Sequence, residues 1–169
     1  GVRMLTPADY SVSLPLILNR YCASATTDDF SNPTSGWPIR DTGSVIYRYL
    51  DGEYNIYHRN ANEWAAVSRG DVWNKSKLIQ ASGRIDKNQG MWGLLFGLNN
   101  DWTDFYTFEI SPNDQRWYFF HYIGSTGWIL VDQGSTATIQ PGNASNTLSI
   151  HDQYGFLGFQ INGSWVTYQ

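Results

Sequence analysis

The sequence has little of what helices, nucleic-acid surfaces or disulfide frameworks require. Only 15% of its 169 residues are charged, and Lys and Arg occur singly and are absent after Arg116. With a net charge of −4 and no basic stripe, we expect no binding to nucleic acid. No apolar run approaches the ~20 residues that span a bilayer, so we expect no membrane insertion. The single cysteine, Cys22, is expected to be a small buried hydrophobe, with an intermolecular bridge as the alternative.

The abundant residues are those of strands and turns. The chain has 8 Trp, 11 Tyr, 8 Phe and 16 Gly, a composition that favours β-structure over helix. After Thr27, short apolar or alternating runs recur about every 8 to 12 residues, which is typical of an antiparallel sandwich. Asp51-Gly52 and Asn162-Gly163 are predicted hairpin turns. The predicted strands are 45–50, 53–58, 64–67, 77–85, 91–98, 105–110, 116–122, 127–131, 147–150, 156–161 and 165–168.

The first 27 residues differ in composition from the rest of the chain, and they predict an extended arm. We place the arm at residues 1–27 and the sandwich at residues 28–169. An apolar segment inside the arm is a candidate donor strand, formed by Val12, Leu14, Leu16, Ile17 and Leu18. Pro15 argues against a central position for it, because proline cannot donate to a strand ladder.

A series of short motifs follows the arm in a recognisable order. It begins with Asp28-Asp29-Phe30, continues with Ser35-Gly36-Trp37 and Asp51-Gly52-Glu53-Tyr54, and ends with Asn146-Thr147-Leu148 and Phe159-Gln160-Ile161-Asn162-Gly163. The order resembles the concanavalin A-like, laminin-G-like jelly rolls of secreted bacterial proteins, which are related to sugar-binding and keto-disaccharide hydrolase domains. The resemblance implies an all-β, two-sheet antiparallel jelly-roll sandwich that is extracellular or displayed at the cell surface.

The same resemblance implies that the sandwich is incomplete. Members of the family continue past the Asn-Gly hairpin with two closing strands, whereas this chain stops at Gln169. An open sheet leaves backbone groups unpaired, so we expect either that this chain has been cut before its closing strands or that a strand from elsewhere fills the vacancy. The arm is the candidate, inserting either in its own domain or in a neighbouring subunit.

The residues of catalysis are missing from the sequence. Jelly-roll glucanases carry alternating carboxylates on one strand, and this chain has no such run and no nucleophile elbow, so we expect no enzymatic activity. Glu109 is predicted to be a solvent-facing strand residue. Asp28 and Asp29 resemble an acidic start that supplies oxygen ligands to calcium in some of these sandwiches. Calcium is therefore the one cofactor that we consider, with no cofactor as the main expectation.

Exposed aromatic side chains would suit sugars, which stack their C–H faces on rings while polar groups bind the hydroxyls. The candidate residues for a sugar site are Trp73, Asn100, Trp102, Arg116, Trp117 and Trp128. With 8 Trp in the chain, most must belong to the core. For each candidate tryptophan, a position in the core is therefore the alternative to a role in sugar binding.

Two functions follow from these features. The first is a self-assembling surface subunit, in which the arm of one copy complements the sandwich of the next and the chain polymerises into a filament. The alternative is a carbohydrate-binding or adhesion module of a secreted protein. The expected partners are accordingly other copies of the chain or surface glycans.

Overall fold

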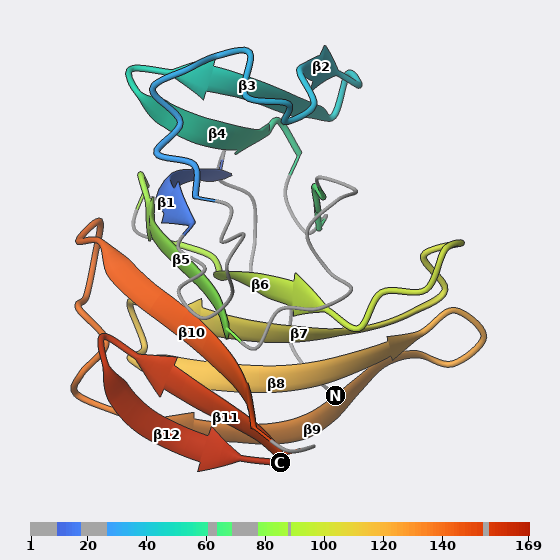
Figure 1. Cartoon of the computed structure of the whole chain (residues 1–169), viewed down its shortest axis with the longest axis vertical. Helices are drawn as coiled ribbons and strands as arrows, with labels where there is room; N and C mark the ends of the chain where they lie inside the picture. The colour runs from blue at the N-terminus through green and yellow to red at the C-terminus, as the bar shows by residue number, and fades with distance from the viewer. Residues whose placement is uncertain (1–9, 18–26, 61–63, 69–77, 88, 154–155) are drawn as a thin grey trace.

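The computed structural model describes residues 10–17, 27–60, 64–68, 78–87, 89–153 and 156–169, which form strands, turns and loops (Figure 1). Twelve strands lie in these residues. They are β1 (Tyr10–Ile17), β2 (Arg40–Asp41), β3 (Val45–Leu50), β4 (Glu53–His58), β5 (Leu78–Ile85), β6 (Trp92–Phe96), β7 (Asp104–Ser111), β8 (Arg116–Ile123), β9 (Gly127–Ser135), β10 (Asn146–Gln153), β11 (Phe156–Ile161) and β12 (Ser164–Tyr168).

The strands form two antiparallel sheets. Sheet A has the order β12-β11-β10-β5-β1-β4-β3-β2, and sheet B has the order β6-β7-β8-β9. In Figure 1 strands β10 to β12 lie in front of sheet B, while β2 to β4 lie at the top. We call β2 to β4, which form one end of sheet A, the upper unit. The predicted all-β antiparallel sandwich is confirmed.

Strand β1, from the predicted arm, lies in the middle of sheet A. It pairs with β4 on one side and β5 on the other, and without it the sheet would divide into β2–β4 and β5, β10–β12. The register against β5 shifts between Ser13 and Leu16, so Pro15 lies in a bulge. A bulge tolerates a residue without an N–H, which explains how proline occurs in a central strand. Leu18 and Cys22 lie outside the described residues.

Two apolar clusters hold the fold together. The larger cluster lies between sheet B and strands β5, β10 and β11, with Phe108, Ile110, Leu148, Phe159 and Ile161 completely buried. Burying one such side chain stabilises the folded state by roughly 1.5–3 kcal/mol. The smaller cluster belongs to the upper unit and consists of Phe30, Val45, Tyr47, Tyr54 and Ile56.

Strand β8 divides its aromatic run between two faces of sheet B. Trp117 and Phe119 join the larger cluster, whereas Tyr118 and Phe120 stack on the opposite face with ring centroids 5.7 Å apart. Alternate residues of a strand point to opposite faces, so this division follows from the pleat. We call the second face the outer face of sheet B.

The strand predictions differ from the structure in several places, including the ends of β6 and β10, which lie at Phe96 and Gln153 instead of residues 98 and 150. Residues 64–67 were predicted as a strand, but they have no regular structure and pair with no strand. Strand β9 continues to Ser135, beyond its predicted end, and the short strand β2 was not predicted. The two predicted hairpins are confirmed: Asp51 and Asn162 have φ of 53° and 50°, each followed by a glycine with positive φ.

Candidate functional site

The segment 64–68 lies between the smaller cluster and the outer face of sheet B. The ring of Trp64 contacts Phe105 at 5.7 Å between centroids, and it also meets Tyr122 and Trp128. Ala65 and Val67 pack instead against the smaller cluster. The segment has apolar contacts on both sides without a strand partner, which explains why its run of apolar residues does not form a strand.

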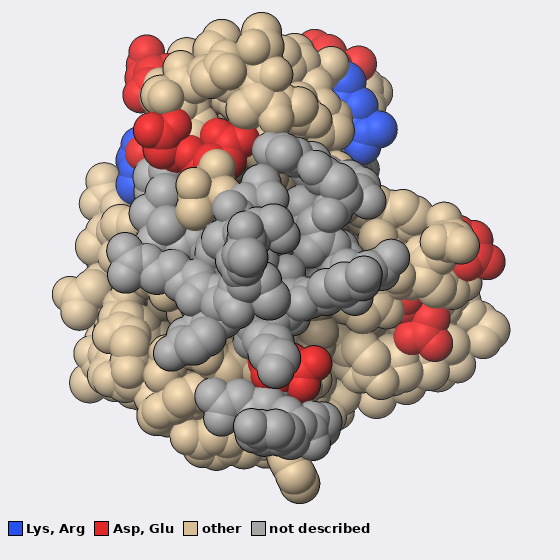
Figure 2. Space-filling model, in the orientation of Figure 1, with Lys and Arg blue, Asp and Glu red and all other residues tan. Residues whose placement is uncertain are grey.

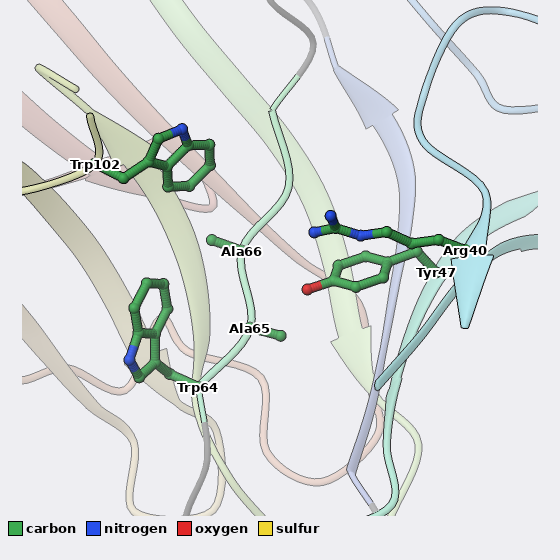
Figure 3. A pocket seen from close by; sticks show the side chains of 6 residues that line it. All are labelled: Arg40, Tyr47, Trp64, Ala65, Ala66 and Trp102. Atoms are coloured by element: carbon green, nitrogen blue, oxygen red, sulfur yellow. The ribbon is translucent and has the colours of Figure 1, made fainter. Parts of the chain in front are cut away.

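A cleft of about 360 Å³ opens beside this segment. Its volume is at the low end of the ~300–1,000 Å³ typical of ligand sites. Figure 3 shows the two indole rings of Trp64 and Trp102 on one side of the segment, and Arg40 with Tyr47 on the other. The described lining consists of Arg40, Tyr47, Trp64, Ala65, Ala66 and Trp102.

Trp102 reaches the cleft from a tightly bonded loop. The side-chain oxygen of Asn99 accepts hydrogen bonds from the backbone N–H groups of Thr103 (2.9 Å) and Asp104 (3.0 Å). The Asn99 amide also donates to the Thr103 hydroxyl at 2.9 Å. Trp102 has φ of 60°, in the left-handed region that residues with a Cβ seldom adopt, and its side chain is 36% exposed. Such strain persists where the surroundings enforce it, and it often marks a functional site.

The opposite side of the cleft is formed by Arg40 and Tyr47. The guanidinium carbon of Arg40 lies 4.6 Å from the centre of the Tyr47 ring, a cation–π contact. Tyr47 is 5% exposed and belongs to the smaller cluster, so its ring is a fixed base for the guanidinium. The described lining of the cleft thus combines two indole side chains with one cationic group.

The sequence-predicted sugar residues divide between the cleft, its surroundings and the core. Trp102 lines the cleft, and Trp128, 39% exposed, contacts the ring of Trp64 behind it. Asn100 is exposed in the same loop as Trp102. Trp117 is 6% exposed inside the larger cluster, so its prediction as a surface residue is corrected to a core position.

Two further candidates lie elsewhere. Arg116 is exposed at the far end of β8, where it donates to Gln133 at 2.9 Å, and it does not line the cleft. Trp73 lies outside the described residues. The predicted set therefore supplies one cleft-lining residue, Trp102, and one residue that supports the cleft, Trp128.

Arg40, Tyr47 and Trp64 were missed by the sequence reasoning. Trp64 is the one with a visible signal, since it begins the apolar run Trp64-Ala65-Ala66-Val67, which was predicted as a strand. Arg40 and Tyr47 are ordinary strand residues in sequence. Only the pairing of β2 with β3, which sets Arg40 opposite Tyr47, brings them together.

Asp28 and Asp29 have structural roles in the described chain. The carboxylate of Asp28 accepts hydrogen bonds from the Phe30 N–H at 2.9 Å and from the Trp37 indole at 3.0 Å. Asp29 accepts from the backbone and hydroxyl of Ser31, and these bonds lower the pKa of Asp29. Within the described residues, no three His, Cys, Asp or Glu side chains gather closely enough to hold a metal ion.

Glu109 lies on the outer face of sheet B, opposite Gly93 of β6. A Cβ at Gly93 would clash with the backbone oxygen of Phe108 and approach the Cγ of Glu109 to 2.7 Å, so the neighbouring backbone and the glutamate both require glycine here. The Glu109 side chain is half-buried and closely surrounded by protein atoms. The resulting loss of hydration disfavours the charged carboxylate and raises the pKa of Glu109. The predicted solvent-facing side chain is therefore corrected to a partly desolvated one.

Comparisons with protein-family models, with curated proteins and with solved structures give no match. None of the described residues belongs to a helix long and apolar enough to cross a membrane.

Proposed function

We propose that this protein is a glycan-binding module that acts in a secreted or cell-surface setting. The observation that carries the proposal is the pair of indole rings, Trp64 and Trp102, at one open cleft (Figure 3). Pyranose rings bind proteins by stacking their C–H faces on indoles, while nearby polar groups bind the hydroxyls. The candidate polar groups are Arg40, which lines the cleft, and Asn100, which is exposed in the same loop as Trp102.

The two rings differ in how they are held, and both arrangements favour binding. Trp64 is 52% exposed, but one side of its ring rests on Phe105, Tyr122 and Trp128. Trp102 is held by its loop instead. Rings that are fixed before the ligand arrives lose little conformational freedom on binding, which increases affinity.

The test is a glycan array followed by calorimetry on the best oligosaccharide. We expect Trp64→Ala and Trp102→Ala each to reduce affinity by about tenfold or more, since removal of one stacking ring costs on the order of 1–3 kcal/mol. Trp165→Ala is the matched control, because Trp165 is 44% exposed on β12 and does not line the cleft. Equal binding by all three variants and the wild type would exclude the cleft as the site.

A second candidate function is self-assembly, and the open edges of the sheets favour it. Strand β9 is an edge strand of nine residues in which Trp128, Ile129, Leu130 and Val131 are 38–44% exposed. Its one ionisable residue, Asp132, accepts a hydrogen bond from Thr167 of β12 at 2.8 Å, so two edge strands lie on the same side of the sandwich. The surface over β10 to β12 is largely uncharged in Figure 2.

Unprotected apolar edges are the places where a further strand adds to a sheet. The edge strand β2 is different, since it has two residues, Arg40 and Asp41, and both are charged. We expect Leu130→Lys to suppress any self-association seen by light scattering. Ile39→Lys is the control, because Ile39 is 64% exposed outside the β-strands. Self-association that survives Leu130→Lys but not Ile39→Lys would place the contact elsewhere.

The donor-strand form of assembly makes a separate prediction about β1. This strand joins the two parts of sheet A, a position that the β1 of a neighbouring copy could occupy equally well. Ser11 and Tyr57 face each other in the ladder, so a Ser11→Cys, Tyr57→Cys pair in a Cys22→Ser background should form a disulfide. Disulfide-linked ladders on a non-reducing gel support exchange between copies, whereas a monomer band contradicts it.

A further inference from the structure

Resting on the glycan-binding function proposed above, we propose that the cleft selects acidic glycans and that Arg40 binds the carboxylate of a uronic acid residue. The guanidinium of arginine presents a planar fork of N–H donors that matches the two oxygens of a carboxylate. The inference concerns the class of sugar. It rests on three features of the cleft: the position of Arg40, the pairing of its acidic neighbour, and the charge of the lining.

Among the described residues, an aromatic ring holds Arg40 in place and no carboxylate is paired with it. Its guanidinium lies over the ring of Tyr47, whose side chain is buried in the smaller cluster. In Figure 3 the two side chains run parallel from β2 and β3 toward the segment that carries Ala65 and Ala66. Stacking on an aromatic face fixes the plane of the guanidinium and leaves its N–H groups free to bind an acceptor.

The acidic residue next to Arg40 is already paired with another arginine. Asp41 accepts hydrogen bonds from Nη1 and Nη2 of Arg59, at 2.5 Å and 2.6 Å. This pairing keeps the pKa of the Asp41 carboxyl well below its usual range. Within the described part of the chain, no carboxylate forms an ion pair with Arg40.

The described lining of the cleft has a cation but no anion. Arg40 is its one charged residue, and the other five residues are two alanines, two tryptophans and a tyrosine. The whole chain carries a net charge of −4, so its overall field gives an acidic ligand no advantage. Among the described residues, Arg40 is therefore the group that would give the cleft a preference for acidic glycans, and one substitution tests it.

The experiment measures binding of three oligosaccharides of equal length: an oligogalacturonide, a sulfated oligosaccharide and a neutral oligoglucoside. We expect the wild type to bind the oligogalacturonide about tenfold more tightly than the neutral sugar at low salt, the size of a charge-assisted hydrogen bond. Arg40→Gln should abolish that difference, because it should weaken binding of the oligogalacturonide more than binding of the neutral sugar. Added salt should reduce the difference, because the group is exposed.

Arg116→Gln is the matched control, since Arg116 also lies over a tyrosine, Tyr118, at 5.6 Å, but outside the cleft. It should keep the full preference. Equal affinity for acidic and neutral sugars in the wild type would overturn the inference while leaving glycan binding intact. A preference for the sulfated sugar would overturn the assignment to a uronic acid. If the proposed glycan-binding function is itself wrong, neither Trp64→Ala nor Trp102→Ala should change the affinity for any of the sugars.

Discussion

The indole of Trp64 meets the indole of Trp128 edge to face, with 5.7 Å between ring centroids and 89° between ring planes. Trp128 does not line the cleft, so its contribution to binding passes through Trp64. We expect Trp128→Ala to weaken sugar binding by a few fold, less than Trp64→Ala, because it removes a support and not a stacking surface.

The conservative variant Trp128→Phe should restore most of that affinity, since it keeps an aromatic edge against Trp64. Calorimetry on the three variants checks the order. A larger loss for Trp128→Ala than for Trp64→Ala would mean that the sugar contacts Trp128 directly.

Asn99 holds the loop that presents Trp102, and its removal should affect stability and binding together. Asn99→Ala leaves the backbone N–H groups of Thr103 and Asp104 without their acceptor, which should lower the free energy of unfolding by about 1–2 kcal/mol. The variant Asn99→Asp keeps the acceptor oxygen and loses the amide donor, so it should lie between the wild type and Asn99→Ala.

Urea unfolding and sugar affinity are the two measurements for these Asn99 variants. Unchanged affinity in a destabilised Asn99→Ala protein would show that the loop does not need this side chain to place Trp102.

Glu109 predicts a pH dependence of stability with a definite sign. Burial raises the pKa of Glu109 in the folded protein. At a pH between the unfolded and the folded pKa values, the folded state therefore keeps a proton on Glu109 that the unfolded chain has released. The free energy of unfolding therefore falls as the pH rises from the ordinary Glu pKa, about 4.3, through the raised folded value. Glu109→Gln has no such proton and should be stabilised relative to the wild type above the folded pKa.

The measurement is urea unfolding of the wild type and Glu109→Gln at several pH values between about 4 and about 8. The two stabilities should diverge as the pH rises, with the variant higher. Parallel curves would show that the Glu109 carboxyl titrates normally in the folded state.

Gly134 has a packing role that a single methyl group should reveal. A Cβ at this position would approach the Trp117 ring to 2.7 Å, and Trp117 is buried with little space to move. Gly134→Ala should therefore lower the free energy of unfolding by about 1–3 kcal/mol through overpacking. The neighbouring exposed Ser135→Ala should change stability by less than about 0.5 kcal/mol. A neutral Gly134→Ala would mean that the indole shifts without loss of packing.

The strand positions could be read from the sequence to a large extent. Turn residues with a preference for positive φ, such as Asp51-Gly52 and Asn162-Gly163, bounded the hairpins because few other residues adopt that conformation. The segment 64–67 was the clear failure. Its apolar residues contact the smaller cluster on one side and the outer face of sheet B on the other, and a run with apolar contacts on both sides looks the same in sequence whether or not it has strand partners.

The faces of the strands were harder to predict than their positions. In Trp117-Tyr118-Phe119-Phe120 every residue is aromatic, so the pattern does not indicate which side faces the core. The structure places Trp117 inside and Tyr118 outside. One of the two strand-borne tryptophans predicted as sugar ligands was therefore a core residue.

By itself, the sequence determined that this protein is an antiparallel β-sandwich, because turn chemistry and aromatic content are local properties that act within a few residues. It also indicated an aromatic surface, and Trp102 within it. The tertiary structure alone decided that β1 lies between β4 and β5, and that Arg40, Tyr47, Trp64 and Trp102 line one cleft. Sheet order and the packing of one sheet against another depend on contacts between distant residues, and no local pattern encodes them.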